Sequence, residues 1–236
     1  LALKYRPKDF SDLIGQEYLV ETIQKSIQLN KIPNAYIFTG IRGVGKTTTA
    51  RIVAKMLNCT AFDNSNKPDL LNCDQAKAIT EDRHPDVIEI DAASNTSVEN
   101  AREIIENVKY NPVLGKYKVY IIDEVHMLSK SAFNALLKTL EEPPPHSKFI
   151  FATTEISKVP ITILSRCQRF DLRRIDKKVL SLFLETIANK ENILIEKEAL
   201  NLIVKSSDGS VRDALSILDQ ANVFKLEETI KTEEII

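Results

Sequence analysis

The sequence has few cysteines and no excess of charge of either sign. Its three cysteines, Cys59, Cys73 and Cys167, are sparse and odd in number, which fits reduced thiols in a cytosolic protein better than a disulfide framework. Its 32 basic and 33 acidic residues leave a net charge of −1. This balance excludes a global electrostatic attraction to nucleic acid, so any contact with DNA would need local basic patches.

Long apolar runs are missing as well. No run approaches the length of a membrane span, and residues 1–7 lack the apolar core of a signal peptide, so we expect a cytoplasmic protein with no membrane partner. The 236 residues, 43% of them hydrophobic, suffice for one domain of ordinary length and a smaller second domain. Because the sequence starts with Leu1 and stops within what looks like a new element, we expect both ends to be trimmed.

A glycine-rich segment, residues 40–47, satisfies the phosphate-binding pattern G-x-x-x-x-G-K-[ST]. An apolar strand is predicted before it, at residues 35–39, and an amphipathic helix after it, at residues 48–57. The glycines let consecutive backbone N–H groups converge on one anion, next to the positive end of the helix dipole. The expected nucleotide-binding residues are Gly40, Ile41, Arg42, Gly43, Val44, Gly45, Lys46, Thr47 and Thr48.

Two of these side chains have specific expected partners. Lys46 would reach the β- and γ-phosphates of a nucleoside triphosphate, and the hydroxyl of Thr47 would complete the shell of a Mg²⁺ ion. The predicted cofactors are therefore ATP and Mg²⁺.

Strands and helices alternate along the first part of the sequence. Further strands are predicted at residues 87–90, 119–122 and 148–152, and helices at 17–29, 97–108 and 133–140, the last capped by Ser129 or Ser131. Residues 59–86 break this pattern and are expected to form a loop, because residues 63–69 have the composition of a loop. After about residue 172 the strands cease, and three helices follow at 176–190, 197–206 and 211–224. This order predicts an α/β fold with a parallel sheet, whose ligands bind at the carboxyl ends of its strands, and a small all-helical domain.

An acidic pair follows the apolar strand at residues 119–122. Asp123 lies where a carboxylate would hold the water shell of Mg²⁺ opposite Thr47, and Glu124 could polarise the attacking water as general base. Such a pair could also be a solvated turn, but the neighbouring phosphate-binding segment favours catalysis. Thr153 or Thr154, closing the next strand, could hydrogen-bond the γ-phosphate or the water.

Two arginines are candidates for stabilising a transferring phosphoryl group. Arg166 could offer its planar charge to the nucleotide of a neighbouring subunit, and Arg212, at the start of the last helix, could reach the nucleotide of its own chain. From spacing alone, a surface ion pair is the more common role for either residue.

Taken together, these motifs resemble the clamp-loader branch of the AAA+ ATPases, within it the gamma/tau family of bacterial DNA polymerase III. The matching stretches are residues 2–7, 40–48, 89–94, 122–128, 133–144, 165–167 and 209–215. The resemblance implies a five-stranded parallel sheet in an AAA+ domain over residues 1–172, a helical lid over 173–225, and at 226–236 a linker or the start of a collar domain. It also implies that Thr154 is sensor 1, Arg166 a finger acting in trans, and Arg212 sensor 2.

The sequence departs from the family at a four-cysteine zinc module, here the degenerate segment 58–86. The positions aligned with the ligands hold Cys59, Leu70, Cys73 and Ala76. His84 could add a third ligand, but structural zinc prefers four nitrogen or sulfur ligands, so we expect no zinc.

In the family, helix N-termini follow duplex phosphates, which makes residues 94–102 the candidate region for DNA. Thr96 and Ser97 could bind phosphate through hydroxyl and backbone N–H groups. Asn95 and Thr96 are equally plausible as a helix cap, and both interpretations stay open.

The sequence thus predicts an ATPase subunit of a clamp loader, working with other clamp-loader subunits, a sliding clamp and primer–template DNA. Its finger would serve another site, so the isolated chain should be a poor ATPase. No carboxylate arrangement of a polymerase is present. The alternatives are a branch-migration motor similar to RuvB and a delta-prime-type subunit that does not hydrolyse ATP; the intact Lys46, Thr47, Asp123 and Glu124 argue against the second.

Overall fold

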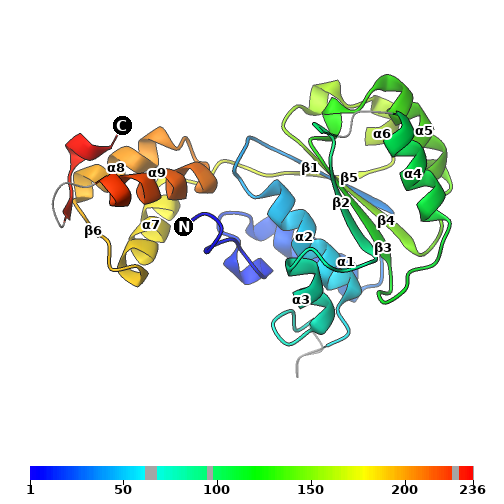
Figure 1. The fold of residues 1–236 in the computed structure, drawn as a ribbon, viewed down its shortest axis with the longest axis horizontal. Coiled ribbons are helices and arrows are strands. Elements are labelled where there is room, and N and C mark those ends of the chain that lie inside the picture. The colour runs from blue at the N-terminus through cyan, green and yellow to red at the C-terminus, as the bar shows by residue number, and fades with distance from the viewer. Residues whose placement is uncertain (62–67, 95–97, 225–228, 236) are drawn as a thin grey trace.

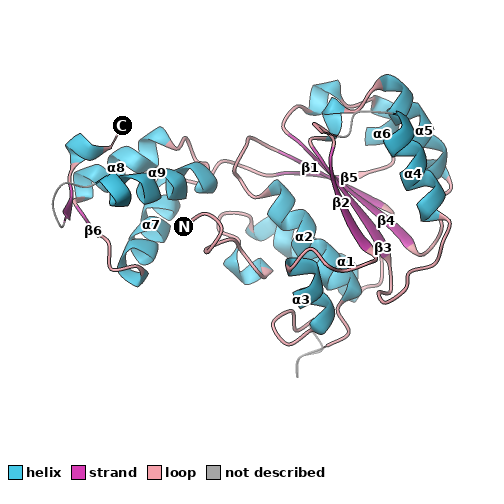
Figure 2. Cartoon of the chain, in the orientation of Figure 1, coloured by secondary structure: helices cyan, strands magenta, loops and turns pink. Residues whose placement is uncertain are grey.

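The computed structural model describes residues 1–61, 68–94, 98–224 and 229–235. A parallel five-stranded sheet in the order β2-β3-β4-β1-β5 forms its centre. The strands are β1 (Ala35–Thr39), β2 (Val87–Asp91), β3 (Lys118–Asp123), β4 (Ser147–Thr153) and β5 (Gln168–Asp171). Figure 2 shows them together between two groups of helices.

Helices cover both faces of this sheet (Figure 1). One face carries α1 (Glu17–Gln28), α2 (Lys46–Asn58) and α3 (Asp74–Thr80), and the other carries α4 (Val98–Val108), α5 (Lys130–Glu141) and the short α6 (Ile161–Leu164). Successive side chains of β1 point to opposite faces and contribute to both cores. Tyr36 and Phe38 pack on the first face, and Ile37 packs on the second. All three side chains are fully buried, as expected for a strand covered on both sides.

A separate group of helices follows the sheet. It consists of α7 (Lys177–Lys190), α8 (Lys197–Ser206) and α9 (Val211–Phe224) around an apolar core that includes Leu180, Leu184, Ile203 and Leu218. The N-terminal residues pack against this core, among them Leu1, Ala2 and Tyr5. Within the described ranges, no helix is both long and apolar enough to cross a membrane.

Most expected elements are confirmed, including the parallel sheet and the three final helices. Ser129, and not Ser131, caps α5, because its hydroxyl accepts a hydrogen bond from the backbone N–H of Ala132. The described residues also include short 3₁₀ turns at Phe10–Asp12, Val125–Met127, Ile156–Lys158 and Thr232–Glu234.

Two expectations were wrong. Residues 59–86 are not loop throughout, because α3 forms there and buries Ala76 and Ile79 against α2. Strands also do not cease after residue 172, since Leu194–Ile195 (β6) and Thr229–Ile230 (β7) pair in parallel beside the helices. Both departures involve elements of seven residues or fewer, too short to show a hydrophobic period.

Candidate functional site

The phosphate-binding segment connects β1 to α2 and touches the helical lid. Gly43 adopts a left-handed backbone (φ +77°), and a Cβ there would lie 2.0 Å from the Ser210 hydroxyl oxygen. The backbone N–H of Arg212 donates to the Gly43 carbonyl at 3.3 Å. Only glycine therefore fits this contact between the loop and the start of α9.

Lys46 is buried at the first position of α2, with 6% of its surface exposed. Its Nζ donates to the carbonyl oxygens of Gly40 and Ile41, both at 3.0 Å. Burial lowers its pKa, while the negative charges of Glu124 and Asp123 oppose that shift. A phosphate group would give this ammonium a charged partner that two carbonyls do not supply.

Thr47 and Asp123 meet across the carboxyl edge of the sheet. The Thr47 hydroxyl donates to Asp123 Oδ2 at 2.5 Å, and the Glu124 backbone N–H donates to Asp123 Oδ1 at 2.9 Å. A hydroxyl and a carboxylate at this separation are oxygen donors of the kind Mg²⁺ prefers. Among the described residues, no cluster of three or more His, Cys, Asp or Glu could hold a metal.

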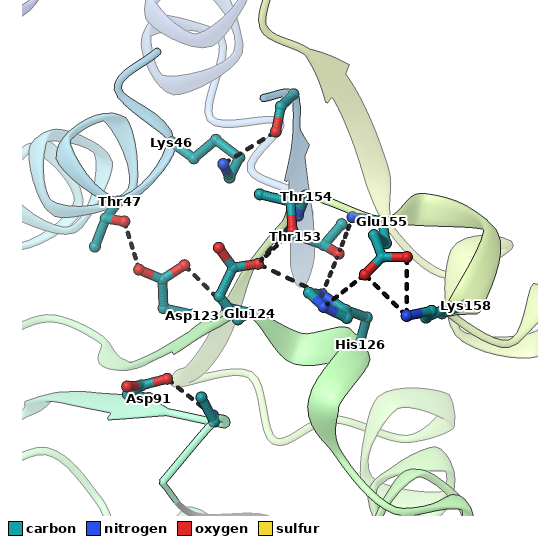
Figure 3. Close-up of polar contacts among 12 residues, drawn as sticks. Lys46, Thr47, Asp91, Asp123, Glu124, His126, Thr153, Thr154, Glu155 and Lys158 are labelled. Atoms are coloured by element: carbon teal, nitrogen blue, oxygen red, sulfur yellow. Dashed lines mark hydrogen bonds and ion pairs between the residues drawn. The ribbon is translucent and has the colours of Figure 1, made fainter. Parts of the chain in front are cut away.

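Glu124 turns back toward the end of β4 (Figure 3). It has a left-handed backbone (φ +46°), and its Oε2 accepts hydrogen bonds from Thr154, from the hydroxyl at 3.0 Å and the N–H at 3.1 Å. The hydroxyl oxygen of Thr153 instead lies 2.9 Å from His126 Nδ1. The two threonines thus differ, and Thr154 is the one that hydrogen-bonds the acidic pair.

The two arginines lie apart from this cluster. The guanidinium of Arg166 pairs with Glu141 at the end of α5 (2.5 Å) and donates to the Thr162 carbonyl at 2.6 Å. Arg212 is exposed in the first turn of α9, beside the phosphate-binding loop. The structure therefore brings together Lys46, Thr47 and the acidic pair, and it leaves both guanidinium groups outside their hydrogen-bond network.

A cavity of about 220 Å³ adjoins the phosphate-binding loop, and the sequence analysis did not predict it. The N-terminal segment, the loop and the lid helices all line it. The lining includes Tyr5, Arg6, Ile14, Val44, Thr48, Phe183 and Leu215. Its apolar and polar walls beside a phosphate site suit the base and sugar of a nucleotide. The matching stretches at residues 2–7, 40–48 and 209–215 all contribute to its lining, but the sequence alone did not show that they meet.

The two cysteines of the expected zinc remnant are buried. Burial raises the pKa of the Cys59 thiol to about 12, and its Sγ lies 3.1 Å from the Ala61 carbonyl. Leu70 and Ala76 are buried in the same apolar cluster, so nonpolar side chains occupy the positions of two ligands.

His84, the possible third zinc ligand, and Cys167, the remaining cysteine, have other surroundings. His84 contacts the Gln75 side chain through Nε2 at 2.5 Å and the Asp86 backbone N–H through Nδ1. Burial raises the pKa of the Cys167 thiol to about 12, and it packs beside the second core. Loss of zinc binding stays a prediction.

The candidate DNA region falls partly outside the described residues. Asn95, Thr96 and Ser97 are not described, whereas Ser94 and Arg102 are exposed and α4 begins at Val98. Phosphate binding and helix capping therefore both remain open.

Two family profiles match the sequence. One described as "DNA polymerase III, delta subunit" matches residues 15–176, and one described as "DNA polymerase III clamp loader subunit, ATPase lid domain" matches residues 180–224. Together they span both the sheet and the following helices.

Curated relatives agree with these profiles. The chain is 50% identical over 221 residues to DNA polymerase III subunit tau of Escherichia coli K12, covering 94% of this chain and 34% of that protein. It is 49% identical to subunit tau of Bacillus subtilis (93% and 39%) and 47% identical to subunit gamma/tau of Mycoplasma genitalium (98% and 38%). The chain therefore spans somewhat more than a third of the length of these relatives.

Solved structures support the fold. A Thermotoga maritima RuvB structure titled a Holliday junction branch migration motor aligns with a TM-score of 0.71 over 98% of this chain and 70% of that one, at 19% identity. A point variant of the same protein aligns equally well. At this identity the likeness shows the fold alone and carries no information about function.

Proposed function

Because the chain belongs to the clamp-loader family of DNA polymerase III, we propose that it is an ATPase subunit that loads a sliding clamp onto primed DNA. The observation that carries the proposal is the chain of contacts from Thr47 through Asp123 and Glu124 to Thr154, next to buried Lys46. In a P-loop fold, this edge of the sheet is where a nucleoside triphosphate binds.

The proposed nucleotide site uses residues 40–48 as a cradle for the phosphates. Lys46 would exchange its two carbonyl partners for the β- and γ-phosphates, and Thr47 with Asp123 would hold Mg²⁺. The metal would supply charge neutralisation at the β- and γ-oxygens. Glu124 would orient and deprotonate the attacking water, while Thr154 would fix the Glu124 carboxylate or contact the γ-phosphate.

Arg166 and Arg212 are proposed to complete the site from different sides. Arg212, which adjoins Gly43 through its backbone, would sense the γ-phosphate from the lid of its own chain. Arg166 would act on the nucleotide of a neighbouring subunit, leaving Glu141 to do so. Such an arrangement makes hydrolysis depend on assembly.

We also propose partners and domain boundaries, and both are inferred from the clamp-loader family. ATP binding would order several subunits into an assembly that opens the clamp, and hydrolysis on primer–template DNA would release it in the cytoplasm. Residues 1–172 would form the AAA+ domain, 173–225 the lid, and 226–236 a linker or the start of a further domain.

A branch-migration motor similar to RuvB is the alternative that the sequence analysis left open, and the likeness in fold at 19% identity does not favour it. The relatives at 47–50% identity are subunits of DNA polymerase III, which favours clamp loading. A non-hydrolysing delta-prime role is disfavoured by the preserved contact of Thr47 with Asp123.

The test is clamp loading by the full-length protein with its partner subunits. We expect ATP-dependent transfer of a labelled clamp to primed circular DNA, and its loss in Lys46→Ala. Lys55→Ala, a matched control on the same helix with a lysine that lies away from the loop, should load normally. ATP-driven migration of a four-way junction without clamp loading would instead support the motor.

A further inference from the structure

His126 has a largely buried side chain to which neither the motifs nor the proposed function assigns a role. It lies in the 3₁₀ turn Val125–Met127 directly after the acidic pair, and only 6% of its side chain is exposed. Buried imidazole nitrogens cost free energy unless they have partners. Both nitrogens of His126 have polar groups within reach.

Its two nitrogens face the ends of different elements (Figure 3). Nδ1 lies 2.9 Å from the Thr153 hydroxyl and 3.4 Å from Glu124 Oε2, whereas Nε2 lies 3.4 Å from Glu155 Oε1. Glu155 is itself paired with Lys158 at 2.9 Å. The ring therefore links the Glu124 carboxylate to the carboxyl end of β4 and the turn beyond it.

We propose that His126 is a positioning residue for Glu124, holding its carboxylate at the place from which it would activate water. The inference rests on the proposed ATPase function. Oε2 of Glu124 is approached from Thr154 by two donors and from His126 by the imidazole. A glutamate side chain has three rotatable bonds, and a general base works only within hydrogen-bond reach of its water.

Removing the imidazole takes away the contact of His126 with the Glu124 carboxylate and leaves the hydrogen bonds from Thr154 in place. The polar neighbours of the imidazole are Thr153, Glu124 and Glu155, whereas the partners of Lys46 are carbonyls of the phosphate-binding loop. Nucleotide affinity should therefore not change. His126 would then change only the rate of the chemical step, because it changes the fraction of molecules in which the Glu124 carboxylate is correctly placed.

Two amide variants separate the roles of the two nitrogens. Asn places its amide nitrogen as many bonds from the backbone as Nδ1, and Gln places it as many as Nε2. His126→Asn can therefore keep the contact with Glu124 and Thr153, and His126→Gln can keep the contact with Glu155. The proposal predicts that only the first supports Glu124.

The experiment measures ATP hydrolysis by the full-length protein in its complete assembly with clamp and primed DNA. We expect His126→Ala to lower kcat about tenfold with an unchanged KM for ATP, His126→Asn to recover to within about threefold of wild type, and His126→Gln to match His126→Ala. A structural role would instead lower the melting temperature and show no preference for Asn over Gln. Equal activity of the Asn and Gln variants overturns the proposal even if His126→Ala fails to fold.

Glu124→Gln, measured in parallel, separates this inference from the proposed function. If wild type does not hydrolyse ATP, both fail. If Glu124→Gln abolishes hydrolysis while His126→Ala equals wild type, only the positioning role fails. The double variant Glu124→Gln with His126→Ala should be no slower than Glu124→Gln alone, and a further loss of about tenfold would contradict action through Glu124.

Discussion

Two aspartates at opposite ends of neighbouring strands use their carboxylates differently. Asp86 directly precedes β2 and accepts backbone N–H groups from Val113, Leu114 and Gly115 at 2.6–2.7 Å, with 1% of its surface exposed. Asp123 ends β3, is half-buried, and accepts the Thr47 hydroxyl and one backbone N–H.

The difference lies in which partners a ligand could replace. The backbone groups around Asp86 cannot leave without rearranging the loop before β3, so that carboxylate supports the fold. Burial opposes ionisation of Asp86, but the three N–H groups outweigh it and its pKa is lowered. The Thr47 hydroxyl that donates to Asp123 can turn to another partner by rotation of one side chain, as the proposed role in Mg²⁺ binding requires.

The largest expected effect is on Asp123, the aspartate at the carboxyl end of its strand. Asp123→Asn removes the charge opposite Thr47 and should lower ATP hydrolysis in the assembly about 1,000-fold, while the melting temperature stays close to wild type. Hydrolysis assays and thermal unfolding measure the two quantities. Thr47→Ser keeps the hydroxyl and serves as the control. A large loss of stability in Asp123→Asn would show that this end also supports the fold.

A second substitution tests the loop that faces the lid. Gly43→Ala forces a side chain into a left-handed backbone and against the Ser210 hydroxyl, so ATP affinity should fall about tenfold. Gly15→Ala is the matched control, because its backbone is also left-handed (φ +66°) but its nearest neighbour is the flexible end of Ile175. Equal affinities for the two variants, measured by nucleotide titration, would argue against a fixed contact between loop and lid.

Asp86→Asn tests the other aspartate, which lies at the amino end of β2 and is expected to support the fold. Replacing a buried acceptor of three N–H groups should lower the free energy of unfolding by about 1–3 kcal/mol, with hydrolysis per folded molecule unchanged. Asp82→Asn, an exposed change nearby, should have almost no effect on stability. Loss of hydrolysis without loss of stability would reverse the comparison.

The same variant has a defined pH dependence. Because the folded pKa of Asp86 lies below that of the unfolded chain, its contribution is complete above the unfolded value of about 3.9 and is lost as the pH falls through the folded value. The stability difference between wild type and Asp86→Asn should therefore be constant from neutral pH to about pH 4 and shrink in more acid solution. Urea unfolding of both proteins at each pH measures this difference. A difference that stays constant below pH 4 would contradict the prediction.

The smallest expected effect concerns the cysteines beside α3. With nonpolar Leu70 and Ala76 packed in the same cluster as Cys59 and Cys73, dialysis against a chelator should leave the melting temperature unchanged. Metal analysis of the untreated protein provides the control. A fall in melting temperature that zinc alone restores would show that the remnant still binds metal.

Sequence patterns predicted the elements that form the site and missed the contacts between them. Strands such as Ala35–Thr39 and the helix that follows the phosphate-binding motif are local signals, and both were confirmed. The contacts of His126 with Thr153 and of Arg166 with Glu141 join residues 27 and 25 positions apart, and only tertiary packing determines them. The pairing of β6 with β7 has the same origin, since two residues carry no period.

The most direct test of the account is ATP hydrolysis by the full-length protein in its assembly, with Arg166→Ala and Glu141→Gln compared with wild type. Arg166→Ala should bind ATP normally and lose turnover by at least about 100-fold, whereas Glu141→Gln, which removes only the ion pair within the chain, should retain it. The isolated chain should be slow in every form. If it hydrolyses ATP as fast as the assembly and is indifferent to Arg166, the shared site is contradicted.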